Sequence, residues 1–163
     1  MKIALSTDHA GFDKLKQLEE FLSESGHACV NYGPTSYQPD DDYPDFIRPC
    51  AQAVASGECE VGIIFGGSGQ GEAMTANRIQ DARCAVYYGP AKAVDAIDVS
   101  GQAAEDDFEI LRLSREHNDA NMLSLAGRFL NNEAIELAVS IWLNTKFSQD
   151  VRHARRVGKI DES

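Results

Sequence analysis

The chain has 163 residues, of which 43% are hydrophobic and 25% charged, and its formal net charge is −11. This size and composition suit one globular domain with a full core, so we predict a single domain over residues 1–163. The acidic balance argues against nucleic acid and anionic membranes as partners, and it makes any cluster of arginines more informative.

No apolar run reaches the roughly eighteen residues of a membrane span, and no apolar segment long enough for a signal peptide follows the first lysine. We therefore expect a cytosolic protein. The cysteines form no C-x-x-C pair, and we expect reduced, mostly buried thiols without a disulfide or metal role. They are Cys29, Cys50, Cys59 and Cys84.

Apolar runs and helical periodicity alternate along the chain. Strands are predicted at residues 2–7, 27–32, 61–65, 83–87 and 122–125, and helices at 12–25, 43–56, 72–78, 131–144 and 149–160. This alternation predicts an α/β fold, a three-layer α/β/α, Rossmann-like, doubly wound parallel sheet of five strands. With the common strand order 2-1-3-4-5, the first and third strands are neighbours, and Asp8 and His9 lie beside the loop after the third strand.

That loop is the most distinctive stretch of the chain. Gly66, Gly67, Gly69 and Gly71 fall within six residues, between a predicted strand and a predicted helix. Glycines let the backbone approach a ligand, and the N–H groups at the helix start face its negative charge. The spacing is neither a Walker motif nor a dinucleotide fingerprint. Glu72 directly after this nest suits a base that forms an oxyanion, although an ordinary tight turn with a solvated glutamate is the alternative.

Other polar residues stand near strand or helix ends. Asp8-His9 follows the first strand, where a helix cap with a surface histidine is the alternative. His117 precedes the fifth strand and Arg128 follows it. Arg152 and Arg156 share one face of the last predicted helix and suit a phosphate, although a solvated basic helix is the alternative.

Together these pieces resemble the RpiB/LacAB family of sugar-phosphate isomerases. The matching segments span nearly the whole chain in the family's order: 8–12, 42–45, 66–72, 76–77, 115–121, 127–128, 152–153 and 156. Many members carry a cysteine base where this chain has Gly66, so the chain resembles the branch in which a glutamate, here Glu72, is the base. The segment 89–113 is longer than usual in the family, which leaves the size of the substrate open.

The resemblance implies an aldose–ketose isomerase that works through an enediolate, with ribose 5-phosphate and ribulose 5-phosphate as the first expectation. It gives Glu72 the role of base and His117 that of ring-opening acid, with Asp8 as its partner. It implies that the enediolate is held by Ser68 and by the backbone amides of Gly67, Ser68, Gly69, Gln70 and Gly71. It also implies that the phosphate is bound by His9, Arg128, Arg152 and Arg156, and that Asn118 orients the sugar.

The resemblance implies neither a metal nor another cofactor, since amides meet the oxyanion. The family's sites lie between subunits, so it also implies a homodimer or a dimer of dimers with shared active sites. His117, Asn118 or some arginines can then come from a partner chain. The alternatives are an isomerase of erythrose 4-, allose 6- or galactose 6-phosphate, or a phosphosugar-binding module without catalysis.

Overall fold

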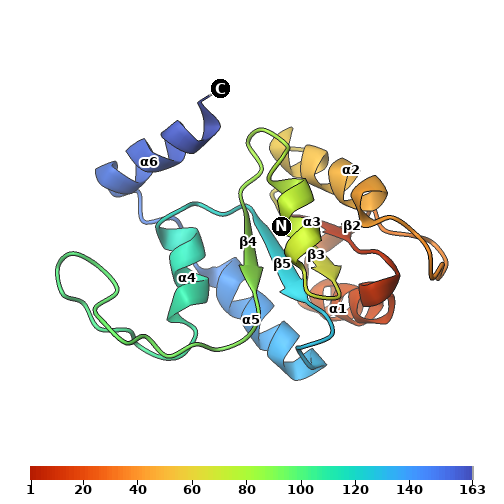
Figure 1. The fold of residues 1–163 in the computed structure, drawn as a ribbon, viewed down its shortest axis with the longest axis horizontal. Coiled ribbons are helices and arrows are strands. Elements are labelled where there is room, and N and C mark those ends of the chain that lie inside the picture. The colour runs from red at the N-terminus through yellow and green to blue at the C-terminus, as the bar shows by residue number, and fades with distance from the viewer. Residues whose placement is uncertain (163) are drawn as a thin grey trace.

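The computed structural model describes residues 1–162, which form an α/β fold around one five-stranded, all-parallel sheet (Figure 1). The strands are β1 (Lys2–Ser6), β2 (Ala28–Asn31), β3 (Val61–Gly66), β4 (Cys84–Tyr87) and β5 (Met122–Ala126). The helices are α1 (Phe12–Glu24), α2 (Tyr43–Ala55), α3 (Gln70–Ala76), α4 (Glu109–Glu116), α5 (Asn132–Asn144) and α6 (Val151–Asp161), with a 3-10 turn η1 (His9–Gly11). All predicted strands and helices are present, whereas α4 was not predicted.

The strand order is β2-β1-β3-β5-β4, so the predicted order 2-1-3-4-5 is wrong for the last two strands. Every residue of β5 is buried, whereas β4 is half-buried, and a strand with that exposure belongs at an edge. At this edge the Asn77 side chain makes two hydrogen bonds of the kind that a neighbouring strand would make. Its Nδ2 donates to the carbonyl oxygen of Cys84 (3.0 Å), and the Cys84 N–H donates to its Oδ1 (2.7 Å).

Helices cover both faces of the sheet, because successive strand residues point to opposite sides. Ile3, Leu5 and Phe65 pack on one face with residues of α1, α4 and α5, including the fully buried Trp142. Ala4 and its neighbours on the other face pack against α2 and α3. The result is the expected three-layer arrangement, from which α6 stands apart (Figure 1).

Residues 88–108 between β4 and α4 form an excursion that projects from the body (Figure 1). The Ala91 N–H donates to the Asp107 carbonyl (2.7 Å), and the Ile97 N–H donates to the Gln102 carbonyl (2.8 Å). The two limbs of the excursion are therefore held together at its base and near its tip. The predicted long segment 89–113 thus comprises this excursion and the first turn of α4.

Within residues 1–162, no helix combines the length and apolarity that crossing a membrane requires. The four cysteines are free thiols, of which Cys50 and Cys59 are buried. Burial raises the pKa of the Cys50 thiol well above its usual value.

Candidate active site

The glycine loop joins the buried end of β3 to the start of α3. Gly69 has φ 74°, in the left-handed region that favours glycine. A Cβ there would lie 2.9 Å from Ser124 Oγ, and this hydroxyl donates to the Gly69 carbonyl (2.7 Å). The turn therefore needs glycine both for its conformation and for its contact with β5.

Glu72 lies under this loop and is only 5% exposed, not solvated. A Cβ on Gly66 would lie 2.0 Å from Oε1 of Glu72. The carboxyl group thus occupies the space that a side chain at residue 66 would take. Burial raises the pKa of Glu72, a nearby Asp8 raises it further, and a backbone hydrogen bond and His9 oppose the shift.

Asp8 and His9 follow β1 and lie across the cleft from the glycine loop. Asp8 is buried, and its Oδ1 accepts a hydrogen bond from the Ala10 N–H (2.9 Å), which caps η1. The Nδ1 atom of His9 lies 2.7 Å from Oδ1 of Asp41 and 3.9 Å from Oδ2 of Asp8. These three residues each offer one atom suited to a metal ion, and the atoms lie within 4.8 Å of one another.

Arg128 reaches the same cleft because β5, and not β4, lies beside β3. The Gly127 N–H donates to the Gly66 carbonyl (2.9 Å), and the Arg128 N–H donates to the Gly67 carbonyl (3.1 Å). A Cβ on Gly67 would lie 3.4 Å from Cζ of Arg128, so the guanidinium group lies against the loop. The observed strand order thus places a cation at the glycine loop.

The cleft between these elements has a volume of about 740 Å³. Its lining includes eight residues predicted as site residues and also Asp41, Asp42 and Tyr43, for which the sequence indicates no role. The predicted residues in the lining are Asp8, His9, Gly67, Ser68, Gln70, Gly71, Glu72 and Arg128. Gly69 belongs to the same loop but is not in the lining.

The position of the Tyr43 ring accounts for the glycine at residue 71. A Cβ on Gly71 would lie 2.6 Å from the Tyr43 hydroxyl oxygen, so this ring covers the start of α3. In the sequence, Tyr43 is visible as the start of a helix and as part of the matching segment 42–45, without an assigned role. Asp41 is visible only as one acid in a run of three.

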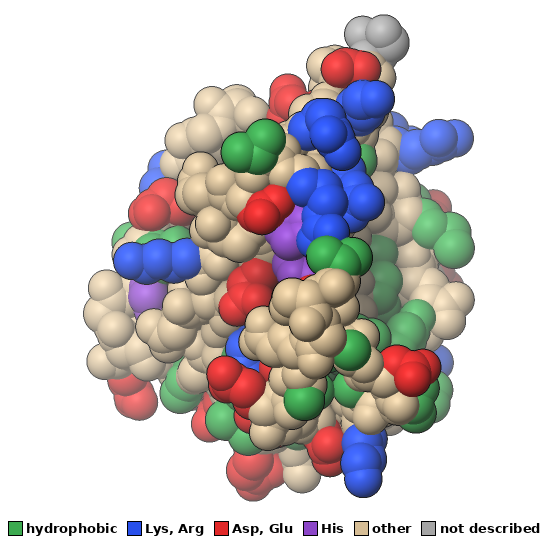
Figure 2. Space-filling view, turned by 90° about the vertical axis from the view of Figure 1, so that its left-hand side faces the viewer, with side chains coloured by type: hydrophobic (Ala, Val, Ile, Leu, Met, Phe, Trp, Pro, Cys, Tyr) green, Lys and Arg blue, Asp and Glu red, His purple; other side chains and the backbone are tan. Residues whose placement is uncertain are grey.

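The remaining predicted residues lie elsewhere in the chain. His117 follows α4, and its ring packs on that of His153 with centroids 4.0 Å apart. Burial lowers the pKa of His117, and His153 lowers it further. Arg152 comes within 3.3 Å of His153 through its Nη2 atom, and basic side chains gather beside histidines on this face of the molecule (Figure 2).

This second group does not line the cleft. It contains His117, Asn118, Arg152 and Arg156, and its first two members precede β5, whereas Arg128 follows β5. Since the strands are parallel, the group lies at the amino end of the sheet and the cleft at the carboxyl end. The structure therefore brings the predicted site residues together in two groups.

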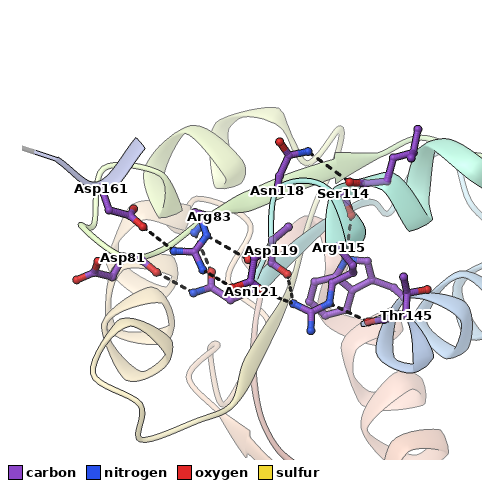
Figure 3. A network of polar contacts seen from close by, with 12 residues as sticks. Asp81, Arg83, Ser114, Arg115, Asn118, Asp119, Asn121, Thr145 and Asp161 are labelled. Carbon is purple, nitrogen blue, oxygen red and sulfur yellow. Dashed lines mark hydrogen bonds and ion pairs between the residues drawn. The ribbon is translucent and has the colours of Figure 1, made fainter. Parts of the chain in front are cut away.

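A polar network holds the turn that carries His117 and Asn118 (Figure 3). Arg115 donates from Nε to the Thr145 carbonyl (3.3 Å) and from Nη1 to the Ala120 carbonyl. Arg83 donates from Nε to the Asp119 carbonyl (3.1 Å) and from Nη2 to its Oδ2 (3.1 Å). Much of the motif at residues 115–121 thus shapes the turn.

The whole chain resembles proteins of known family. A sequence model described as Ribose/Galactose Isomerase (LacAB_rpiB) matches residues 3–102 and 101–160. Ribose-5-phosphate isomerase B of Mycobacterium leprae is 33% identical over 162 residues, which cover 99% of this chain and 89% of the relative. The putative sugar phosphate isomerase YwlF of Bacillus subtilis is 32% identical and is covered over 96% of its length, with 99% of this chain.

Solved structures agree in fold over nearly the full length. Ribose-5-phosphate isomerase B from Clostridium thermocellum has a TM-score of 0.83 and 35% identity, covering 99% of this chain and 95% of its own. The enzyme from Mycoplasma genitalium, solved with bound ribulose 5-phosphate, has a TM-score of 0.83 and 28% identity, covering 98% and 93%.

Proposed function

The chain belongs to the RpiB/LacAB family of ribose and galactose isomerases, and from this premise we propose that it interconverts D-ribose 5-phosphate and D-ribulose 5-phosphate. The observation that carries the proposal is the buried carboxyl group of Glu72 beneath the glycine loop. A carboxylate in that place has no use in a site that only holds phosphate, whereas it suits a base. The relative crystallised with ribulose 5-phosphate supports this substrate.

In the proposed reaction, the Glu72 carboxylate takes the proton from C2 of the open-chain aldose. The electrons of that C–H bond form a C1–C2 double bond, and the carbonyl oxygen on C1 becomes an oxyanion. Ser68 and the loop amides stabilise this charge. Glu72 then returns the proton to C1, the O2 hydroxyl passes its proton to the oxyanion on O1, and the ketose results. A buried carboxylate is a stronger base than a solvated one, which favours the first step.

The phosphate group is assigned to cationic side chains on both sides of the site. His9 and Arg128 belong to the cleft, and Arg152 and Arg156 belong to the second group. The molecule carries a net charge of −11, so its average field repels a dianionic phosphate. Local guanidinium groups offset this repulsion with bidentate hydrogen bonds.

One chain does not supply all these residues to one substrate. A strand rises about 3.3 Å per residue, so the five residues of β5 separate the two groups by roughly 16 Å. That is longer than a pentose phosphate. We therefore infer that a second copy supplies His117, Asn118, Arg152 and Arg156 to the cleft of the first.

The surface between the two groups suits such a copy. Gln70 and Met74 line the cleft and also a neighbouring groove beside β4, and Met74 is 68% exposed. The next groove along this edge ends at Asn118 and includes the exposed Ile160. A two-fold arrangement across this edge would place each chain's second group against the other's cleft.

The decisive experiment measures isomerase rates on ribose 5-phosphate, erythrose 4-phosphate, allose 6-phosphate and galactose 6-phosphate. We expect the highest kcat/KM on ribose 5-phosphate. A higher value on another substrate would assign the enzyme to that sugar, and the kinship with YwlF together with the excursion at residues 88–108 makes this the second candidate. Binding of sugar phosphates without turnover of any would contradict catalysis.

A further inference from the structure

The Asp41 side chain lies at the cleft and bonds there to His9. Its Oδ1 accepts a hydrogen bond from the His9 backbone N–H (3.1 Å) and lies 2.7 Å from Nδ1 of the same residue. The Asp41 side chain is only 8% exposed. Among residues 1–162 its other oxygen, Oδ2, has no hydrogen-bond partner. A buried carboxylate is costly unless it is paired, so this contact with His9 accounts for its position.

The loop that carries Asp41 holds the His9 ring from a second side. Tyr37 lies edge-on to the imidazole, with ring centroids 6.4 Å apart and an interplanar angle of 87°. Tyr37 also lies edge-on to Phe12, at 6.2 Å. The loop between β2 and α2 therefore fixes both the tilt of the imidazole and the partner of its Nδ1 atom.

Asp8 does not serve this purpose, although it is the nearer residue in the chain. Its Oδ1 is taken by the Ala10 N–H, and its Oδ2 lies 3.9 Å from Nδ1 of His9, beyond hydrogen-bond distance. Two carboxylates thus flank the ring, but one alone bonds to it. The imidazole orientation depends on Asp41.

We propose that Asp41 is a positioning residue that accepts a hydrogen bond from Nδ1–H of His9 and turns Nε2 toward the cleft to bind the substrate's phosphate. With Nδ1–H held by a carboxylate, the second ring nitrogen is left to form a hydrogen bond with a phosphate oxygen of the ligand. This inference rests on the proposed function, in which His9 binds the phosphate.

The first test compares Asp41→Asn with Asp40→Asn. Asp40 is exposed and the substitution changes the charge equally, so it is a matched control. We expect Asp41→Asn to raise KM for the sugar phosphate about tenfold, the effect of weakening one charge-assisted hydrogen bond. We expect kcat to change less than KM, and Asp40→Asn to leave both unchanged. Equal effects of the two substitutions would overturn the proposal.

A double-mutant cycle tests whether Asp41 acts through His9. In a His9→Gln background, Asp41→Asn should add no further loss of kcat/KM, because the residue through which it acts is absent. Losses that add independently would show that Asp41 works by another route. Activity that disappears with EDTA and returns with a divalent cation would also overturn the proposal, since Asp41 and His9 would then be metal ligands.

Nuclear magnetic resonance provides a test that needs no substrate. In the unmodified protein, the neutral His9 ring should be the Nδ1–H tautomer, whereas Asp41→Asn should show a mixture of tautomers. Titration with inorganic phosphate should show weaker binding to Asp41→Asn. An unchanged tautomer and unchanged phosphate affinity would contradict the role of Asp41. If the unmodified protein isomerises no sugar phosphate, the proposed function fails, while these two measurements still decide the role of Asp41.

Discussion

Glu72 must be ionised to accept a proton, yet its burial favours the neutral acid. Burial and Asp8 both raise its pKa above the usual value for glutamate. Below that pKa the side chain is protonated and cannot act as a base. We therefore expect kcat/KM to rise with pH through an apparent pKa above that of a solvated glutamate. Glu72→Gln should lower kcat by about 10³-fold while sugar-phosphate affinity changes little. Activity close to that of the unmodified enzyme would direct attention to another base.

The same residue should cost stability at neutral pH. Its folded pKa is raised, so the folded state binds the Glu72 proton more tightly than the unfolded state does. The stabilisation from that proton is present at low pH and is lost as pH rises through the folded pKa. Glu72→Gln should therefore raise Tm at neutral pH, and the gain should shrink on acidification. Thermal unfolding of both proteins across this pH range measures it, and a gain that grows at acid pH would contradict the assignment.

Gly66 is needed for the space it leaves. Alanine there would place its Cβ 2.0 Å from Oε1 of Glu72, so the flexible carboxylate must move. A displacement of about 1 Å can cost roughly 10²-fold in rate, and we expect Gly66→Ala to lower kcat by about this factor with the fold retained. Gly158→Ala is the control, because a Cβ there meets nothing within 4 Å. Circular dichroism would separate a lost fold from a displaced base.

At the scale of elements, sequence patterns predicted the helices and strands whose formation depends on neighbouring residues. The apolar run before Gly66 and the helical periodicity of α1, α2 and α5 depend on neighbouring residues, and these elements are present as predicted. The order of β4 and β5 depends on which strand is buried on both sides, a property of the assembled sheet. Helix α4 has only eight residues and follows an acidic segment, so its pattern was too short to separate from a polar connection.

The candidate site divides in the same way. The glycine loop, Asp8 and His9 could be predicted because strand ends and turn chemistry mark them. Asp41 could not, since its function depends on a contact with a residue 32 positions away. The sequence presents it as one member of an acidic run, and only the fold distinguishes it from the exposed Asp40.

Helix α6 contains two of the residues proposed to bind the phosphate and a third arginine that serves as a control. Arg152 and Arg156 are one helical turn apart, whereas Arg155 projects about 100° around the helix axis from Arg156. Replacing either of the first two with alanine should raise KM for sugar phosphates by about ten- to a hundredfold, the value of a charge-assisted contact. Arg155→Ala should behave as an ordinary surface change. An equal effect of Arg155→Ala would mean that the helix presents a different face to the phosphate.

At the scale of the whole molecule, the two groups of site residues lie at opposite ends of the sheet. If a second copy completes the site, Glu72→Gln and His117→Ala should each be inactive alone but should complement each other when mixed. In a mixed dimer, one of the two sites receives both intact residues, so after random exchange about a quarter of full activity should return. Steady-state rates after co-refolding the two variants measure this. No recovery, although sedimentation shows mixed dimers, would contradict shared sites.

The placement of β5 between β3 and β4 also affects how the chain folds during its synthesis. Gly62 pairs with Met122, so a loop of about sixty residues must close before these strands meet. Until then the Gly66 and Gly67 carbonyls lack the amides of Gly127 and Arg128. Contacts this distant in sequence slow folding. During synthesis, a ribosome-bound chain that has not yet released β5 carries the glycine loop without its scaffold, so the ability to bind anions is among the last properties the nascent protein acquires.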